Sequence, residues 1–149
     1  PSSGRVFISV KQADKPKIAS IAKKLHELGY LLIATDGTCA VLEAAGVPAQ
    51  VVKKMAEGRP NIGDLIRNQD IQLIINTPSG KGPILDEAKI RSLAVSFNIP
   101  CITTINAARA AVTALGAVKN RGLEVKSIQE YHRELQGKQT LKTEVTKGY

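Results

Sequence analysis

A short polar turn, Thr35-Asp36-Gly37-Thr38, stands between an apolar run and a segment typical of a helix. The run at residues 31–34 predicts a buried strand, and residues 39–45 predict a helix that Gly46 ends. The first N–H groups of a helix lack partners within it, and with the helix dipole they attract anions. Threonine hydroxyls and a glycine that admits a close ligand suit a phosphate. The alternative is that the turn only reverses the chain and caps the helix.

Polar side chains also follow the other predicted strands, which span residues 5–10, 50–53, 70–76 and 100–104. They comprise Ser9, Lys11 and Lys15, then Lys53 and Lys54, then Asn76, Thr77, Ser79, Gly80 and Lys81, and finally Thr103 and Thr104. Because ligands of parallel α/β sheets bind at the carboxyl ends of the strands, these groups predict one pocket. Hydroxyls and cations together indicate a phosphate-bearing small molecule.

Helical segments alternate with these strands, which predicts an α/β fold with a parallel sheet covered on both faces. Asp14 is expected to cap the first helix, with Pro16 in its first turn and Gly29 at its end. Further helices are expected at 63–68, 86–97, 106–115 with Asn106 as cap, and 127–135. Residues 1–136 are expected to form one domain and residues 137–149 a loosely ordered polar tail. Because the first residue is Pro1, we expect a piece excised from a longer chain.

The composition limits the classes of partner. A net charge of +8 and a pI near 9.7 favour phosphorylated metabolites, nucleic acid or an acidic protein surface. Aromatic residues make up 3% of the chain, which disfavours nucleic acid bound by base stacking. No apolar stretch is long enough to cross a membrane. Cys39 and Cys101 show no metal or redox spacing, so we expect buried free thiols in a reducing, cytoplasmic compartment.

Groups that could catalyse a reaction are scarce near the predicted pocket. His26 and His132 fall on predicted helices away from the strand ends. Asp36 could act as a base, although a turn former is the simpler interpretation, and Asp86 is interpreted as a helix cap. No metal-ligand spacing, nucleophile triad or GxxxxGK[ST] motif occurs. The sequence therefore favours binding over catalysis, with no catalytic residue, metal or cofactor in this domain.

Several segments together resemble the methylglyoxal-synthase-like domains, and most closely the one at the carboxyl end of the carbamoyl-phosphate synthase large subunit. The resemblance covers roughly residues 4 to 135 and is carried by GRVFISV with Asp14-Lys15, ATDGT, VVKKMAEGRPNI, IINTPSGKG, and PCITTINAARA through VKSIQEYH. It implies a Rossmann-like three-layer sandwich with a five-stranded, mostly parallel sheet. It also implies an allosteric role, in which a nucleotide monophosphate bound here retunes distant ATP-using sites.

The resemblance implies further partners. The parent enzyme would be a cytoplasmic or plastid ligase that uses ATP with Mg or Mn in pyrimidine and arginine biosynthesis. This domain would contact the rest of the large subunit, and the glutamine amidotransferase small subunit would belong to the same enzyme. Exposed faces of the last two predicted helices are candidates for docking or self-association. Neither nucleic acid nor a membrane is expected as a partner.

Binding residues are also implied by the resemblance. The phosphate would be held by lysines, threonines and one polar loop, and the ribose and base would lie near residues from other segments. The expected phosphate contacts are Lys15, Thr35, Thr38, Lys54, Asn76, Thr77 and Ser79. The expected ribose and base contacts are Ile62, Asp86, Ile90 and Thr104, with Asn76 shared.

Two residues depart from patterns seen in relatives. Arg59 stands where methylglyoxal synthases carry a catalytic aspartate, and a guanidinium cannot act as a base. Pro78 replaces a threonine that some relatives carry. The retained Thr35-to-Thr38 motif favours a nucleotide over N-acetylglutamate, with uridine monophosphate (UMP) preferred and inosine monophosphate (IMP) the second choice. The alternative is a free-standing methylglyoxal synthase-type phosphate lyase.

Overall fold

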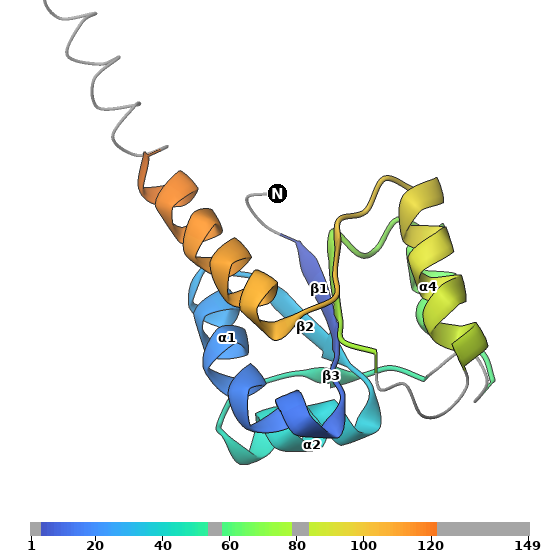
Figure 1. Ribbon diagram of the computed structural model, residues 1–149, viewed down its shortest axis with the longest axis horizontal. Helices are drawn as coiled ribbons and strands as arrows, with labels where there is room; N and C mark the ends of the chain where they lie inside the picture. The colour runs from blue at the N-terminus through green and yellow to red at the C-terminus, as the bar shows by residue number, and fades with distance from the viewer. Residues whose placement is uncertain (1–3, 54–57, 79–83, 122–149) are drawn as a thin grey trace, which may run out of the picture. The chain divides into compact units, whose positions relative to one another are not determined.

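A computed structural model of the chain describes residues 4–53, 58–78 and 84–121, without the side chains of residues 84–86. Its five strands form one parallel sheet in the order β3-β2-β1-β4-β5 (Figure 1). The strands are β1 (Arg5–Ser9), β2 (Leu31–Ala34), β3 (Gln50–Val51), β4 (Leu73–Asn76) and β5 (Cys101–Ile102). The predicted α/β class is confirmed, and the sheet is entirely parallel.

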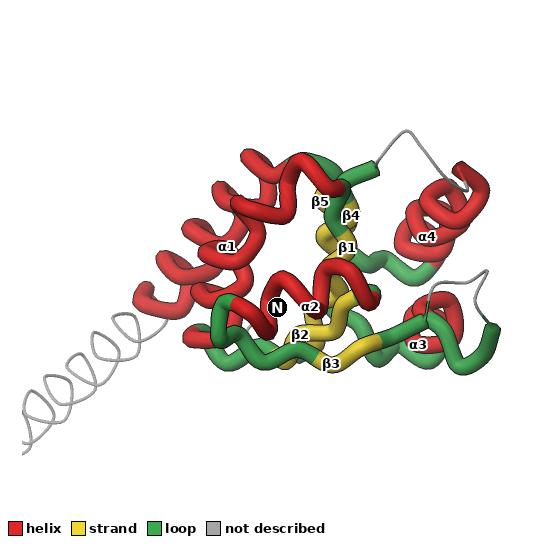
Figure 2. The backbone as a smooth tube through the Cα atoms, turned by 90° about the horizontal axis from the view of Figure 1, so that it is seen from below, coloured by secondary structure: helices red, strands yellow, loops and turns green. Residues whose placement is uncertain are grey.

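Helices cover both faces of the sheet, as predicted (Figure 2). One face carries α1 (Lys15–Glu27) and α2 (Asp36–Ala44), and the other carries α3 (Ile62–Arg67) and α4 (Ile84–Ser96). A final helical segment covers residues 105–121. The first part of this segment lies next to α1, because Arg109 and Val112 line a small hollow together with Ser20 of α1.

Pro1–Thr113 form one compact unit and Ala114–Tyr149 a second. Of the second unit, the structure describes the helical segment up to residue 121. The helix predicted at 127–135, which includes His132, and the tail predicted at 137–149 lie outside the described residues.

The core on the α3 and α4 side is centred on Phe7 of β1. Phe7 is paired in register with Ile33 of β2 and with Ile74 of β4, and all three are buried. Ile62, Ile66, Ile71, Ile90 and Ala94 complete this cluster. Because successive strand residues point to opposite faces, Val6 and Ile8 enter the opposite core with the buried apolar residues of α1.

The two carboxyl ends of β1 and β4 lie side by side at the point where the strand order reverses. The chain begins in the middle of the sheet, builds β2 and β3 on one side, and returns to place β4 beside β1. Ser9 is paired in register with Asn76 there. In open α/β sheets, a reversal of this kind is where ligands bind.

Strands are shorter than predicted, because pairing ends them early. β1 ends at Ser9 rather than Val10, and β4 begins at Leu73 rather than Asp70. The edge strands β3 and β5 each pair over two residues with a single neighbour. Beyond β3, Lys53 forms an isolated parallel bridge with Asn61.

The starts of α2 and α4 lie at least two residues before the predicted ones. α2 begins at Asp36 rather than Cys39, so Asp36, Gly37 and Thr38 form its first turn, and the interpretation of Asp36 as a turn former is wrong. α4 begins at Ile84, which places Asp86 inside the first turn rather than at the cap. In α2 the helix includes polar residues that the apolar periodicity left outside, whereas in α4 it includes Ile84 and Leu85 before the predicted start.

The cap of the final helical segment is also corrected. Its helix begins at residue 105, and the Thr104 hydroxyl oxygen accepts a hydrogen bond from the N–H of Ala107 at 3.2 Å. Thr104, and not Asn106, is therefore the N-cap, because its side-chain oxygen reaches the third N–H of the helix. The segment also continues past the predicted end at Leu115.

Helix ends around α1 follow the predictions in position. Asp14 is the N-cap residue of α1 and Pro16 lies in the first turn, but the Asp14 side chain makes no capping hydrogen bond, because a 3-10 turn over Gln12–Asp14 leads directly into the helix. Gly29 and Gly46 have φ of 95° and 78°, a left-handed conformation that favours glycine after a helix.

Both cysteines are free thiols, as predicted. Cys39 is buried in α2, with its Sγ 3.4 Å from the carbonyl oxygen of Ala49 and 3.7 Å from a carboxylate oxygen of Glu43. Burial, assisted by Glu43, raises the pKa of the Cys39 thiol. Cys101 is half-buried in β5, and burial raises its pKa as well. Raised pKa values are typical of unreactive, structural thiols.

Candidate functional site

The N-terminus of α2 lies beside the carboxyl end of β1. Thr35 holds the N-cap position, but its side chain makes no capping bond. Its hydroxyl donates instead to the hydroxyl oxygen of Ser9 at 3.2 Å, which ties β2 to β1. α2 is nine residues long, so its first turn presents unpaired N–H groups with a partial positive charge.

Lys15 places its ammonium group directly over this helix terminus. A Cβ atom built on Gly37 would lie 2.8 Å from Lys15 Nζ, so the absence of a side chain at Gly37 makes room for the ammonium. Lys15 Nζ donates to the amide oxygen of Gln12 at 3.0 Å and makes no ion pair with a described carboxylate. A cation at the positive end of a helix is unfavourable unless an anion joins them.

Two buried threonines hold the neighbouring strand ends together. The Thr38 hydroxyl oxygen accepts from the N–H of Val10 at 3.2 Å, and the Thr77 hydroxyl oxygen accepts from the N–H of Lys11 at 2.9 Å. The N–H of Thr77 donates to the carbonyl oxygen of Ser9 at 3.0 Å. A threonine hydroxyl that accepts from the backbone keeps its own proton for a further bond. Both hydroxyls can thus donate to an anion at this edge of the sheet.

The structure brings together five of the residues expected at the phosphate. Ser9, Val10 and Lys11 link the three threonines through the hydrogen bonds above. Asn76 lies buried at the end of β4 beside Ser9, and the Lys15 ammonium lies near Gly37 of α2. The five are Lys15, Thr35, Thr38, Asn76 and Thr77. Lys54 and Ser79 lie outside the described residues, so their place at the phosphate stays a prediction.

Of the residues expected at the ribose and base, two lie together in the core and one is exposed. Ile62 and Ile90 are buried in the apolar core under α3 and α4, with 0% and 6% of their surface exposed. Thr104 is exposed and caps the final helical segment. Asp86 lies in α4, and its side chain is outside the described part. Contacts of these four residues with a ribose or base stay predictions.

Ser9 and Gly37 follow predicted strands in the sequence but were not among the expected phosphate contacts. The structure gives both a role, since Ser9 joins three strand ends and Gly37 makes room for the Lys15 ammonium. The signal for Ser9 was its position as the last residue of the central strand. Nothing in the sequence pattern pointed to the contact between Lys15 and Gly37, which come from different helices.

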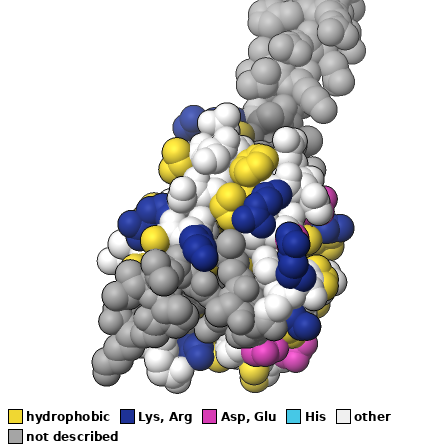
Figure 3. All heavy atoms as spheres, turned by 90° about the vertical axis from the view of Figure 1, so that its right-hand side faces the viewer, with side chains coloured by type: hydrophobic (Ala, Val, Ile, Leu, Met, Phe, Trp, Pro, Cys, Tyr) yellow, Lys and Arg dark blue, Asp and Glu magenta, His cyan; other side chains and the backbone are white. Residues whose placement is uncertain are grey.

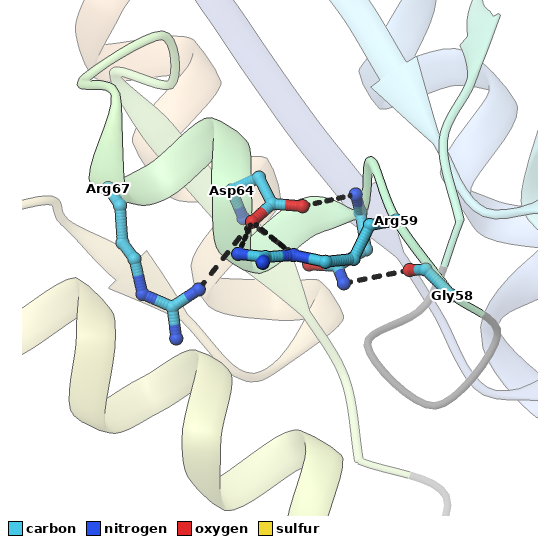
Figure 4. A network of polar contacts seen from close by, with 5 residues as sticks. Gly58, Arg59, Asp64 and Arg67 are labelled. Atoms are coloured by element: carbon cyan, nitrogen blue, oxygen red, sulfur yellow. Dashed lines mark hydrogen bonds and ion pairs between the residues drawn. The ribbon is translucent and has the colours of Figure 1, made fainter.

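Arg59 takes part in an ion pair at the start of α3. Its Nη2 and Nε lie 2.7 and 3.2 Å from Oδ1 of Asp64, and Arg67 Nη1 lies 3.8 Å from the same atom (Figure 4). Asp64 Oδ2 accepts from the N–H of Asn61, while the Asn61 amide oxygen accepts from the N–H of Asp64. This reciprocal capping box fixes the start of α3.

Asp64→Asn is expected to lower the melting temperature at neutral pH. The hydrogen bond from Arg59 and then that from the Asn61 N–H hold the pKa of Asp64 below its ordinary 3.8. Stability from a carboxyl group with a lowered pKa is present above the ordinary pKa and is lost as the pH falls through the folded-state value. Melting curves from about pH 7 down to about pH 2 should therefore show that the difference in melting temperature between wild type and variant disappears in acid.

Glu27→Gln on α1 is the matched control, because Glu27 is exposed and makes no ion pair with a described residue. It should leave the melting temperature unchanged over the same range. An Asp64→Asn protein that melts like wild type at neutral pH would contradict the stabilising role of the network.

Within the described residues, no group of three or more His, Cys, Asp or Glu side chains is arranged to hold a metal ion. Among the described helices, none combines the length and apolar character needed to cross a bilayer.

Comparison with known proteins identifies the family. The model of the MGS-like domain matches residues 17–103. The carbamoyl phosphate synthase large chain of Rhodopirellula baltica is 49% identical over 129 residues, which cover 87% of this chain and 12% of that protein. The C-terminal section of the Methanopyrus kandleri large chain is 48% identical over 134 residues, which cover 89% of this chain and 25% of that protein. The chain therefore spans a minor part of these relatives.

A structural comparison agrees on the fold. The crystal structure of a methylglyoxal synthase from Elizabethkingia anophelis matches with a TM-score of 0.58 and 21% identity, over 75% of this chain and 78% of that one. At this identity the likeness concerns the fold alone. The expected Rossmann-like three-layer architecture is thus confirmed.

Proposed function

The chain belongs to the MGS-like domain family, and on that premise we propose that it is the effector-binding domain of a carbamoyl phosphate synthase large chain. A nucleotide monophosphate binds with its phosphate group at the N-terminus of α2, and this nucleotide regulates the synthesis of carbamoyl phosphate. The free-standing lyase is not favoured, because relatives of 48–49% identity carry the name of the synthase.

The observation that carries the proposal is the Lys15 ammonium over the first turn of α2. The ammonium and the helix terminus are both positive, and no described carboxylate pairs with the ammonium. A phosphate dianion between them would interact favourably with both and accept the hydroxyl protons of Thr38 and Thr77. A neutral ligand would leave the two like charges facing each other.

The finer assignments belong to the same proposal. UMP is the favoured effector and IMP the second choice, with Lys54 and Ser79 as additional phosphate contacts. Ile62, Asp86, Ile90 and Thr104 would lie near the ribose and base. The whole enzyme would use ATP with Mg or Mn and work with a glutamine amidotransferase small subunit. Regulation then requires a coupling free energy on the order of 1–3 kcal/mol between the effector and the ATP-using sites.

Isothermal titration calorimetry of the 149-residue chain with UMP, IMP and uridine tests the proposal. The two monophosphates should bind and raise the melting temperature, since a ligand selective for the folded state stabilises it. Uridine, which lacks the phosphate, should bind far more weakly. Equal affinity for uridine and UMP would refute the phosphate site. Production of methylglyoxal from dihydroxyacetone phosphate would instead support the lyase.

Gly37→Ala is expected to weaken UMP binding while it stabilises the folded chain. The new Cβ would displace the Lys15 ammonium, which is the end of a flexible side chain. Alanine also favours a helix interior over glycine by roughly 0.5–1 kcal/mol. Calorimetry and thermal melts together should show affinity and stability changing in opposite directions.

Gly116→Ala is the matched control for this variant. Gly116 lies in the helical segment 105–121, and a Cβ there would meet nothing within 4 Å. It should stabilise the chain without changing the affinity for UMP. If Gly37→Ala binds UMP as tightly as wild type, the ammonium position is not needed for binding.

A further inference from the structure

A hollow opens on the α3 side of the sheet, next to the edge strand β3. Its volume is about 250 Å³. Five apolar residues line it, together with a glutamine and two cations at its polar margin. The described lining residues are Ile33, Val51, Val52, Pro60 and Leu65, with Gln50, Arg5 and Lys53. This hollow is separate from the hydroxyl cluster at the ends of β1 and β4.

The topology explains why no described helix covers this part of the sheet. α3 has six residues, and its buried side chains pack with Phe7 and Ile74 on the central strands. Leu31 shares a face with Ile33 because side chains alternate along β2. Leu31 is 63% exposed, whereas Ile33 is 3% exposed. Sheets of this class normally have both faces covered, whereas no described helix covers the apolar surface at the β2 and β3 end.

Charge indicates what could cover this surface. Arg5 and Lys53 are exposed and make no ion pair with a described carboxylate, and none of the described lining residues is Asp or Glu. Figure 3 faces the side on which α3 and α4 lie, and its coloured surface carries more Lys and Arg than Asp and Glu. An apolar hollow between unpaired cations complements an apolar group flanked by carboxylates.

Size separates a side chain from a small-molecule ligand. Pockets for small molecules usually measure about 300–1,000 Å³, and this hollow is smaller than that range. It suits one or two apolar side chains of a protein segment. Burying Leu31 under such a segment would also remove an exposed apolar side chain from water.

We propose that this hollow, together with Leu31, Arg5 and Lys53, docks an acidic segment with an apolar anchor from the remainder of the large chain. This inference rests on the proposed function, which makes this chain a domain of that larger protein. In the Rhodopirellula baltica relative, 88% of the protein lies outside the matched part, since the match covers 12% of it. The contact would attach the domain whose effector must influence distant sites.

The test compares thiol labelling in two contexts. Leu31→Cys is introduced into the 149-residue chain and into the full large chain that contains it, and each is treated with a maleimide. Mass spectrometry of the peptide around residue 31 separates its signal from Cys39 and Cys101. Because labelling follows exposure, docking should slow it at least about tenfold in the full chain. Lys23→Cys on α1, exposed in the domain, is the reference for general reactivity.

Charge reversal then tests the recognition chemistry. Arg5→Glu, combined with Leu31→Cys in the full chain, should restore fast labelling, because like charges repel across the contact. Gln50→Glu is a second variant that adds a negative charge at the same margin. Lys24→Glu, exposed on α1, makes the same charge change elsewhere and should leave residue 31 protected.

The outcomes separate this inference from the proposed function. Equal labelling of residue 31 in both contexts, or protection that Arg5→Glu and Gln50→Glu leave intact, overturns the docking surface. Protection of the isolated chain that grows with its concentration assigns the surface to a second copy and also overturns it. UMP and IMP titrations of the same proteins report on the nucleotide site independently, so a wild-type protein that binds neither refutes the proposed nucleotide site and leaves the labelling result standing.

Discussion

Lys15→Gln is expected to weaken UMP binding about 10- to 100-fold, which corresponds to the 1.5–3 kcal/mol typical of a hydrogen bond to a charged group. Glutamine keeps a donor near Gly37 but removes the positive charge that a phosphate would neutralise. Removal of a cation from a helix N-terminus also relieves a repulsion in the free protein. The variant should therefore be at least as stable as wild type without ligand. Calorimetry with UMP and thermal melts with and without UMP measure both effects.

Lys17→Gln is the matched control. Lys17 lies two residues further along α1, is exposed, and makes no ion pair with a described residue. Its substitution removes the same charge from the same helix and should leave UMP affinity within about twofold, since exposed charges contribute little at physiological salt. If both variants bind UMP equally well, net charge rather than the Lys15 position governs binding.

Phe7→Ala is expected to destabilise the chain by about 3–5 kcal/mol. Phe7 is 0% exposed, lies in the central strand and packs between Ile33 and Ile74. Alanine would leave a cavity that the two neighbouring strands cannot close, because their backbones are held by the ladder. Small domains have about 5–15 kcal/mol of stability, so this single change removes much of it. Urea unfolding followed by circular dichroism gives the free energy directly.

Val95→Ala provides the comparison for this loss. Val95 lies on α4 and is 73% exposed, so its truncation should change the free energy of unfolding by less than about 0.5 kcal/mol. Addition of UMP should partly restore the melting temperature of Phe7→Ala, because β1 carries Ser9 and Val10 into the site. A loss below about 1 kcal/mol for Phe7→Ala would place the centre of this core elsewhere.

Local pattern was sufficient for the order and type of the described strands and α-helices. The apolar run at 31–34 and the helical spacing of Ile18, Ile21 and Leu25 depend on neighbours in the sequence, and both elements appear as predicted. Glycine at positions 29 and 46 ends helices because few other residues adopt a left-handed conformation cheaply. The resemblance of motifs to the MGS-like domains is a property of the sequence too, and the family match confirms it.

Helix starts were less predictable, because capping depends on which side-chain oxygen is available to accept a hydrogen bond from the first turn of the helix. Thr35 directs its hydroxyl to Ser9 instead of its own helix, and Asp36 begins the helix that the apolar pattern placed at Cys39. Thr104 caps the final segment, although Asn106 is of an equally suitable residue type. Contacts between segments distant in the sequence decide which residue begins or caps each helix, and a local pattern gives no information about such contacts.

The sequence alone determined that hydroxyls and ammonium groups follow the strands, because strand and helix order sets which residues reach the carboxyl edge of the sheet. Only the tertiary structure decided how these groups meet, with Lys15 of α1 over Gly37 of α2 and the Thr38 and Thr77 hydroxyls bonded to the backbone after β1. It also enclosed Ile62 and Ile90 in the core and left Leu31 exposed. The physical reason is that burial and side-chain contact depend on packing between segments distant in the chain, whereas periodicity and turn chemistry act between neighbours.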